Sequence, residues 1–172
     1  YEVKLEMSEG PFEDDAGVGA HFEKDALGHA RQKAGDQTRH LKRDLHTSVI
    51  KLARNVVMHQ PKIIIGKGQG AVIAAAYGHP GCFEQVLASR NVQSEELPEI
   101  AQAWGNVTGI LIQEPRLSKK GVQLQALRQA APELFSSYPK PSRRTFSWKD
   151  PKVTHYNETK EFASAARIEV VD

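Results

Sequence analysis

The chain has 172 residues, 40% of them hydrophobic and 26% charged, which suffices for one domain with its own core. Its formal net charge of +2 is too small to indicate a nucleic-acid partner, and the basic doublet Arg143-Arg144 is expected on a solvated face. The single cysteine, Cys82, excludes an internal disulfide and favours a reducing compartment. No apolar run reaches the roughly 20 residues of a membrane span.

The first part of the chain lacks a sustained hydrophobic period. Alternation over residues 1–7 predicts an edge strand, and the Gly-, Asp-, Glu- and Lys-rich residues that follow predict loops. We therefore expect residues 1–36 to form an extended or loop-rich arm that contacts other protein subunits, and residues 37–172 to form a single α/β domain. The start at Tyr1 and the apolar end indicate a piece or a processed product of a longer precursor.

From Gln37 onward the hydrophobic pattern is regular. Leu41, Leu45 and Val49 begin an apolar stripe at helical spacing, which predicts an amphipathic helix over 38–59. The unbroken run Ile63–Ile65 predicts a buried strand. The other predicted elements are, in chain order, a helix over 69–78, a strand over 83–89, a helix over 94–104, a strand over 107–113, a helix over 118–131, a strand over 145–148, a helix over 158–166 and a strand over 167–171.

Strands that alternate with helices are typical of βαβ units. Such units need right-handed crossovers, so the pattern predicts an α/β fold: a three-layer sandwich with a mainly parallel sheet flanked by helices. Ligands bind such sheets at the carboxyl ends of the strands. Gly66 and Glu114 both fall at such ends.

The turn between the strand at 63–65 and the next helix is the principal candidate site. Glycines at alternate positions permit positive φ, and the first N–H groups of the helix point toward one another at the positive end of its dipole. This arrangement is typical of an anion-binding turn. The candidate ligand-binding residues are Gly66, Lys67, Gly68, Gln69 and Gly70.

The same five residues resemble the Gly-x-Ser-x-Gly nucleophile turn of the α/β-hydrolase family, and the similarity extends over roughly residues 38–166. The family's order of nucleophile, acid and histidine then implies Gly68, Glu114 and His155 as the triad positions. Gly68 has no side chain to attack a carbonyl, so the resemblance implies a degenerate triad without acyl transfer. The chain is therefore expected to be a non-catalytic binding or structural component, with no cofactor, in a larger protein or assembly.

Two alternatives remain open. Gly66, Gly68 and Ala71 also satisfy the Gly-x-Gly-x-x-Gly/Ala fingerprint, and Arg90 after the strand predicted at 83–89 would suit the 2′-phosphate of NADP in a reductase module. The chain could also be an active hydrolase with another nucleophile. No His-x-x-x-His or Cys-x-x-Cys spacing indicates a metal site.

Overall fold

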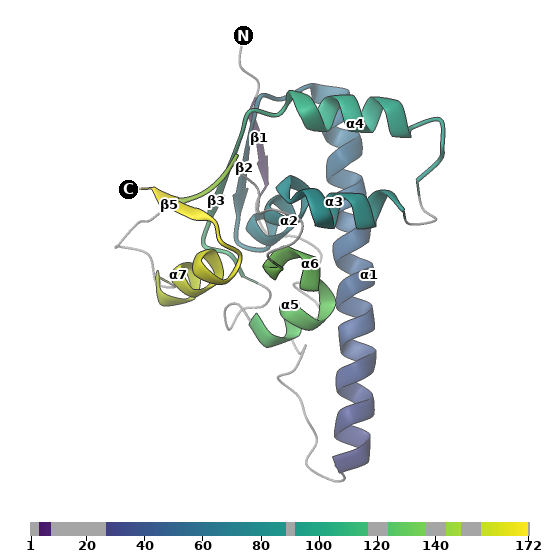
Figure 1. Cartoon of the computed structure of the whole chain (residues 1–172), viewed down its shortest axis with the longest axis vertical. Coiled ribbons are helices and arrows are strands. Elements are labelled where there is room, and N and C mark those ends of the chain that lie inside the picture. The colour runs from purple at the N-terminus through teal and green to yellow at the C-terminus, as the bar shows by residue number, and fades with distance from the viewer. Residues whose placement is uncertain are drawn as a thin grey trace.

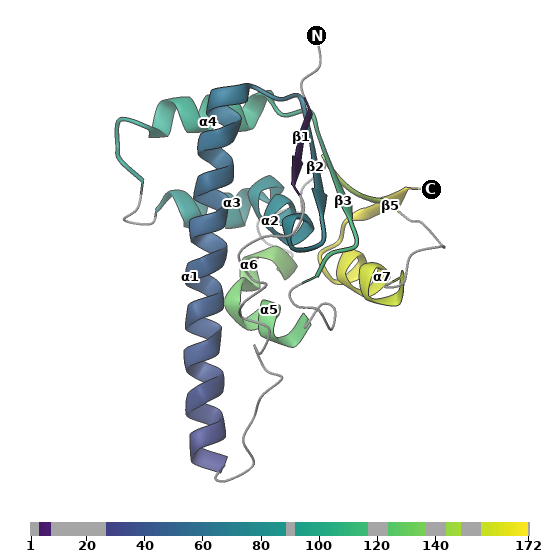
Figure 2. The same cartoon turned by 180° about the vertical axis from the view of Figure 1, so that it is seen from behind.

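The computed structural model describes residues 4–7, 27–88, 92–116, 124–136, 144–148 and 156–171. Within these ranges it describes the side chains of residues 39–88, 92–116, 124–136, 144–147 and 159–171. The predicted α/β fold, with a parallel sheet flanked by helices, is confirmed (Figures 1 and 2).

Five parallel strands form the sheet, and their order across it is their order along the chain, β1-β2-β3-β4-β5. The strands are β1 (Lys4–Met7), β2 (Ile63–Lys67), β3 (Gly109–Gln113), β4 (Thr145–Trp148) and β5 (Glu169–Val171). Every pair of neighbours runs parallel. The strand predicted in the first seven residues therefore lies at one edge of the sheet.

Seven helices join and cover these strands in the described part of the chain. They are α1 (Leu27–His59), α2 (Gln69–Gly78), α3 (Pro80–Leu87), α4 (Leu97–Asn106), α5 (Leu124–Ala130), α6 (Pro132–Phe135) and α7 (Tyr156–Ala165). None of them is long and apolar enough to cross a membrane.

Helix α2 lies between the sheet and α1 (Figures 1 and 2). It packs on β2 and β3 on one side and on α1 on the other, and all ten of its residues are buried. Its sequence, an alanine-rich run without a charge, suits a helix that has no solvent-facing side. The layers thus succeed one another as sheet, α2 and α1.

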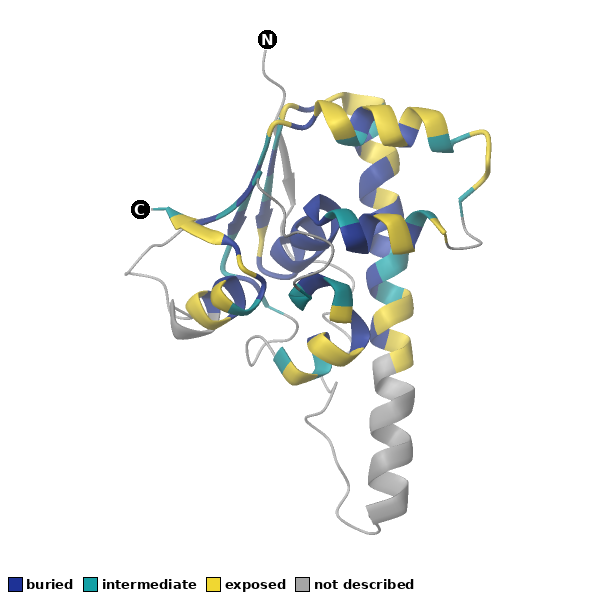
Figure 3. Ribbon diagram, in the orientation of Figure 1, coloured by how far each residue is buried: buried dark blue, intermediate teal, exposed yellow. Residues whose placement is uncertain are grey.

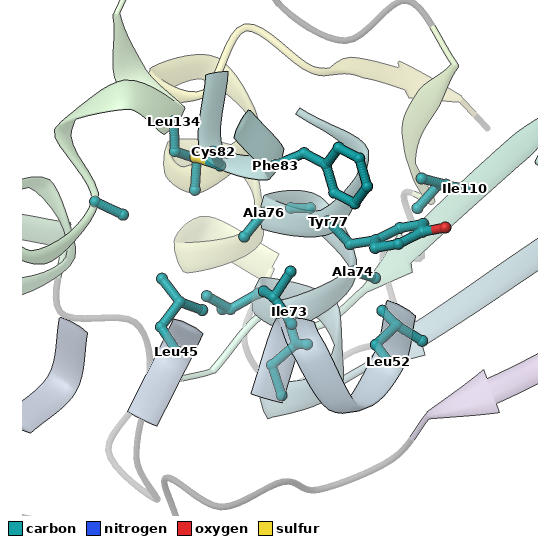
Figure 4. Close-up of a cluster of buried hydrophobic side chains, with 14 of the residues drawn as sticks. Leu45, Leu52, Ile73, Ala74, Ala76, Tyr77, Cys82, Phe83, Ile110 and Leu134 are labelled. Carbon is teal, nitrogen blue, oxygen red and sulfur yellow. The ribbon is translucent and has the colours of Figure 1, made fainter. Parts of the chain in front are cut away.

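Alternate residues of the strands face α2. Ile64, Ile110 and Ile112 are at most 1% exposed, whereas Ile63 and Leu111, on the other face of the sheet, are only half-buried. This two-residue period follows from the pleat of a strand. The core accordingly lies between the sheet and α1, where Leu45, Ile73 and Leu134 converge (Figures 3 and 4).

Three features differ from the predicted elements. Helix α1 begins at Leu27, within the segment expected to be loop-rich, and α4 begins at Leu97 rather than Ser94. The strand predicted over 83–89 is wrong, because residues 83–87 lie in helix α3. His79 caps α3 with its side chain and Pro80 occupies the first turn, where proline needs no backbone N–H partner.

Candidate functional site

The glycine turn joins the carboxyl end of β2 to the first residue of α2. Gly68 forms the bend, with φ 63° and ψ −124°. Residues with a side chain adopt this conformation only with strain, at a cost of about 1–3 kcal/mol. A strained residue between a strand and a helix is also the geometry of the hydrolase nucleophile turn.

Gly66 allows α2 to lie directly on β2. A Cβ atom on Gly66 would stand 2.5 Å from the carbonyl oxygen of Gly70, 2.8 Å from Cβ of Ala74 and 2.9 Å from Cα of Ala71. These distances are too short for any non-bonded carbon, and two of the three atoms belong to the backbone of α2. Close contact of the strand with the helix therefore requires glycine at this position.

The backbone of Gly68 ties the turn to the loop that follows β3. Its N–H donates to the carbonyl of Gln113 at 3.0 Å, and its own carbonyl accepts from the N–H of Arg116 at 2.9 Å. Glu114, between these two partners, has a positive φ of 49°. The candidate acid position thus lies in the loop that is hydrogen-bonded to the candidate nucleophile position.

The structure describes six of the predicted site residues as a continuous turn. Gly66, Gly68, Gln69 and Gly70 are buried, as is Ala71, whereas Lys67 is exposed and Glu114 half-buried. Lys67 is therefore the exposed residue of the turn, and the buried Gly66 serves the contact between β2 and α2. His155 and Arg90 lie outside the described residues.

The structure lacks, among its described residues, the second strand on which the dinucleotide-binding interpretation partly depends. This interpretation needs a second strand directly after the glycine-rich helix, and that segment is the helix α3. Among the described residues after α2, the chain reaches the sheet again at β3, beyond α3 and α4. The strand that was to precede Arg90 is thus replaced by helix α3 over residues 83–87, and the NADP-binding assignment of Gly66, Gly68 and Ala71 rests on the glycine spacing alone.

A second set of side chains, not expected from the sequence, gathers at the other end of α2. Arg144 lies with its guanidinium carbon 3.9 Å from the centre of the Trp104 ring, which also stacks on Phe83 with ring centres 4.9 Å apart. Phe83 in turn meets the edge of Tyr77 at 5.5 Å, and Figure 4 shows these two rings side by side. We call Tyr77, Phe83, Trp104 and Arg144 the aromatic stack.

The expectation that Arg144 lies on a solvated face is wrong. This half-buried guanidinium donates through Nη1 to the carbonyls of Trp104 and Val107, at the carboxyl end of α4. A cation is favourable there because this end of the helix dipole is negative. The indole Nε1 of Trp104 donates to the carbonyl of Tyr77 at 2.7 Å. The aromatic stack thus joins α2, α3, α4 and the start of β4.

Neither Cys82 nor His79 offers an exposed reactive group. Burial raises the pKa of the Cys82 thiol to about 12, so the thiolate nucleophile is not formed near neutral pH. His79 is 2% exposed, and its Nδ1 accepts from the N–H groups of Gly81 and Cys82. His79 is therefore the cap of α3 rather than a catalytic base.

We expect stability to fall as the solution becomes acidic. Burial lowers the pKa of His79 in the folded state, with an opposing effect of Glu133, and burial and Lys42 lower the pKa of His46. The unfolded chain then binds protons first, so the free energy of unfolding is fully retained above pH 6.5 and decreases below it, by at most about 1.4 kcal/mol per pH unit for each histidine. Urea unfolding between pH 7.5 and about pH 5 measures this slope.

Asn in place of His79 provides the control. His79→Asn keeps a side-chain acceptor for the N-cap of α3 but cannot titrate. The dependence of the free energy of unfolding on pH should become weaker in this variant by the contribution of one histidine. It should weaken again when His46→Gln is added. An unchanged slope in His79→Asn would contradict the assignment.

No family model, curated protein or solved structure matches this chain. No group of three His, Cys, Asp or Glu side chains is placed to hold a metal ion in the part of the chain that the structure describes. The functional argument therefore depends on the geometry of the glycine turn.

Proposed function

We propose that this chain is a non-catalytic α/β-hydrolase-like binding or structural component of a larger protein or assembly. The observation that carries the proposal is the conformation of Gly68. It combines the strained bend of a nucleophile turn, between the parallel strand β2 and the buried helix α2, with the one residue type that has no attacking group.

The surroundings of Gly68 are consistent with binding rather than turnover. Lys67, the residue before Gly68, is exposed, and Gly68 directly precedes the amino end of α2, where the helix dipole favours negative charge. An anionic or carbonyl group is the chemistry that this turn suits. The described cysteine, Cys82, is buried and is not available as a replacement nucleophile.

The proposal predicts that the protein does not cleave activated esters and that serine at Gly68 introduces this activity. The unmodified protein should hydrolyse p-nitrophenyl esters no faster than buffer. Gly68→Ser should cleave them, and His155→Ala in that background should reduce the rate by about 10²-fold, as expected when a general base is lost. Absorbance of released p-nitrophenol measures each rate.

Gly68→Ala is the matched control, because it imposes the same backbone strain without a hydroxyl group. Circular dichroism establishes that each variant is folded before its rate is compared. Ester turnover in the unmodified protein that persists in Gly68→Ala would contradict the proposal. It would assign the chain instead to active hydrolases with a nucleophile elsewhere.

A further inference from the structure

The small net charge of the chain conceals an uneven distribution. Helix α1 contains seven Lys and Arg and two Asp, a net charge of +5. The whole chain carries +2, which leaves −3 for all other residues. The reason for expecting no nucleic-acid partner, the charge of the whole chain, therefore does not apply to α1 by itself.

The described side chains of α1 separate into a buried face and a solvent face. Leu41, Leu45, Val49, Leu52 and Val56 are buried toward α2 and its neighbours. The opposite face carries a straight row at steps of three and four residues, which we call the outer stripe: His40, Arg43, Thr47, Lys51, Arg54 and Met58. At 1.5 Å per residue this row is about 27 Å long.

Cations dominate the outer stripe and its flanks. Arg43 and Lys51 are exposed, and so is Arg39, one turn before Arg43. Asp44, the one acid among the described side chains of α1, lies 3.6 Å from Nε of Arg43, and Arg54 is held by both oxygens of Glu96. Arg43 and Lys51 are the two cations nearest the middle of the row, and Arg43 shares its charge with Asp44.

The composition of the stripe indicates what it can bind. Protein interfaces depend on buried aromatic or aliphatic anchors, and the stripe's apolar member is Met58 alone, which is 73% exposed. No Phe, Tyr or Trp lies on the stripe, so it lacks the large rings on which the bases of a single strand stack. Its Arg and Lys side chains are groups that contact phosphate oxygens.

We propose that the outer stripe of α1 binds the phosphate backbone of a double-stranded nucleic acid without reading its sequence. The stripe lies on the far side of α1 from the sheet and the glycine turn, so the proposal does not depend on the function of that turn (Figures 1 and 3). Without base contacts the expected dissociation constant is about 10⁻⁴–10⁻⁶ M at physiological salt.

The test is fluorescence anisotropy of the full chain with a short duplex DNA and a duplex RNA of matching sequence, at about 50 mM and about 200 mM salt. Arg43→Glu/Lys51→Glu should weaken binding at least 10-fold and reduce the slope of log affinity against log salt by about 2, one for each lost phosphate contact. A scrambled duplex should bind as tightly as the first.

The matched control is Lys160→Glu/Arg167→Glu, which makes the same change in net charge at exposed positions on and just after α7. This variant should retain the affinity of the unmodified chain to within about 2-fold, the effect of net charge alone. Equal weakening in both variants would overturn the proposal, as would the absence of duplex binding at the lower salt concentration. A polyglutamate chain that binds as tightly as the duplexes and is equally sensitive to the α1 variant would also overturn it, in favour of an acidic protein partner.

Discussion

Replacing Gly66 with alanine is expected to destabilise the fold by about 3 kcal/mol or more, because the added methyl group has no room. It would meet the carbonyl of Gly70 and the Cα of Ala71, and these backbone atoms cannot move unless α2 shifts away from β2. For a chain of this size the loss corresponds to roughly 6–12 °C in melting temperature, measured by circular dichroism.

Gly105→Ala is the matched control for Gly66→Ala. A Cβ atom at Gly105, in the last turn of α4, would meet nothing within 4 Å. Alanine is the better helix former, so this variant should be equally stable or more stable by up to about 1 kcal/mol. Equal effects of the two substitutions would show that α2 does not approach β2 as closely as described.

Truncating Trp104 to alanine is expected to cost about 3 kcal/mol, because this side chain lies at the centre of the aromatic stack. The substitution removes the ring that contacts both Phe83 and Arg144 and leaves the carbonyl of Tyr77 without its 2.7 Å donor. The half-buried guanidinium of Arg144 also loses its cation–π contact. Urea unfolding followed by far-UV circular dichroism measures the change in the free energy of unfolding.

Phe at position 104 separates the two contributions of the indole. Trp104→Phe keeps an aromatic face for Phe83 and Arg144 but cannot donate to Tyr77, so it should cost about 1–2 kcal/mol. If Trp104→Phe were as destabilising as Trp104→Ala, the ring contacts would contribute nothing and the stack would not be a stabilising unit.

The elements with strong periodicity could be predicted from sequence. The apolar stripe that begins at Leu41 identified α1, and the run of isoleucines at 63–65 identified β2. The prediction for residues 83–89 was wrong because it followed the apolar composition, which suggested a strand. The spacing of Phe83, Val86 and Leu87 by three and four residues suits a helix. The dipeptide His79-Pro80 was the available signal, a capping side chain followed by proline in the first turn.

The site could be located from sequence but its surroundings could not. A strand, alternate glycines and a helix were enough to predict the turn at Gly66–Gly70. Its surroundings include two hydrogen bonds, one donated by the N–H of Gly68 to Gln113 and one accepted by its carbonyl from Arg116, between segments far apart in the chain that no local pattern records. The position of Arg144 could not be predicted for the same reason, because its partners Trp104 and Val107 lie at the carboxyl end of α4, far away in the sequence.

The order of the strands bears on how the chain can fold during its synthesis. Because each strand pairs with the one made just before it, every new strand leaving the ribosome finds its neighbour already present. The sheet can therefore grow in one direction, from β1 toward β5, without a gap held open for a later insertion.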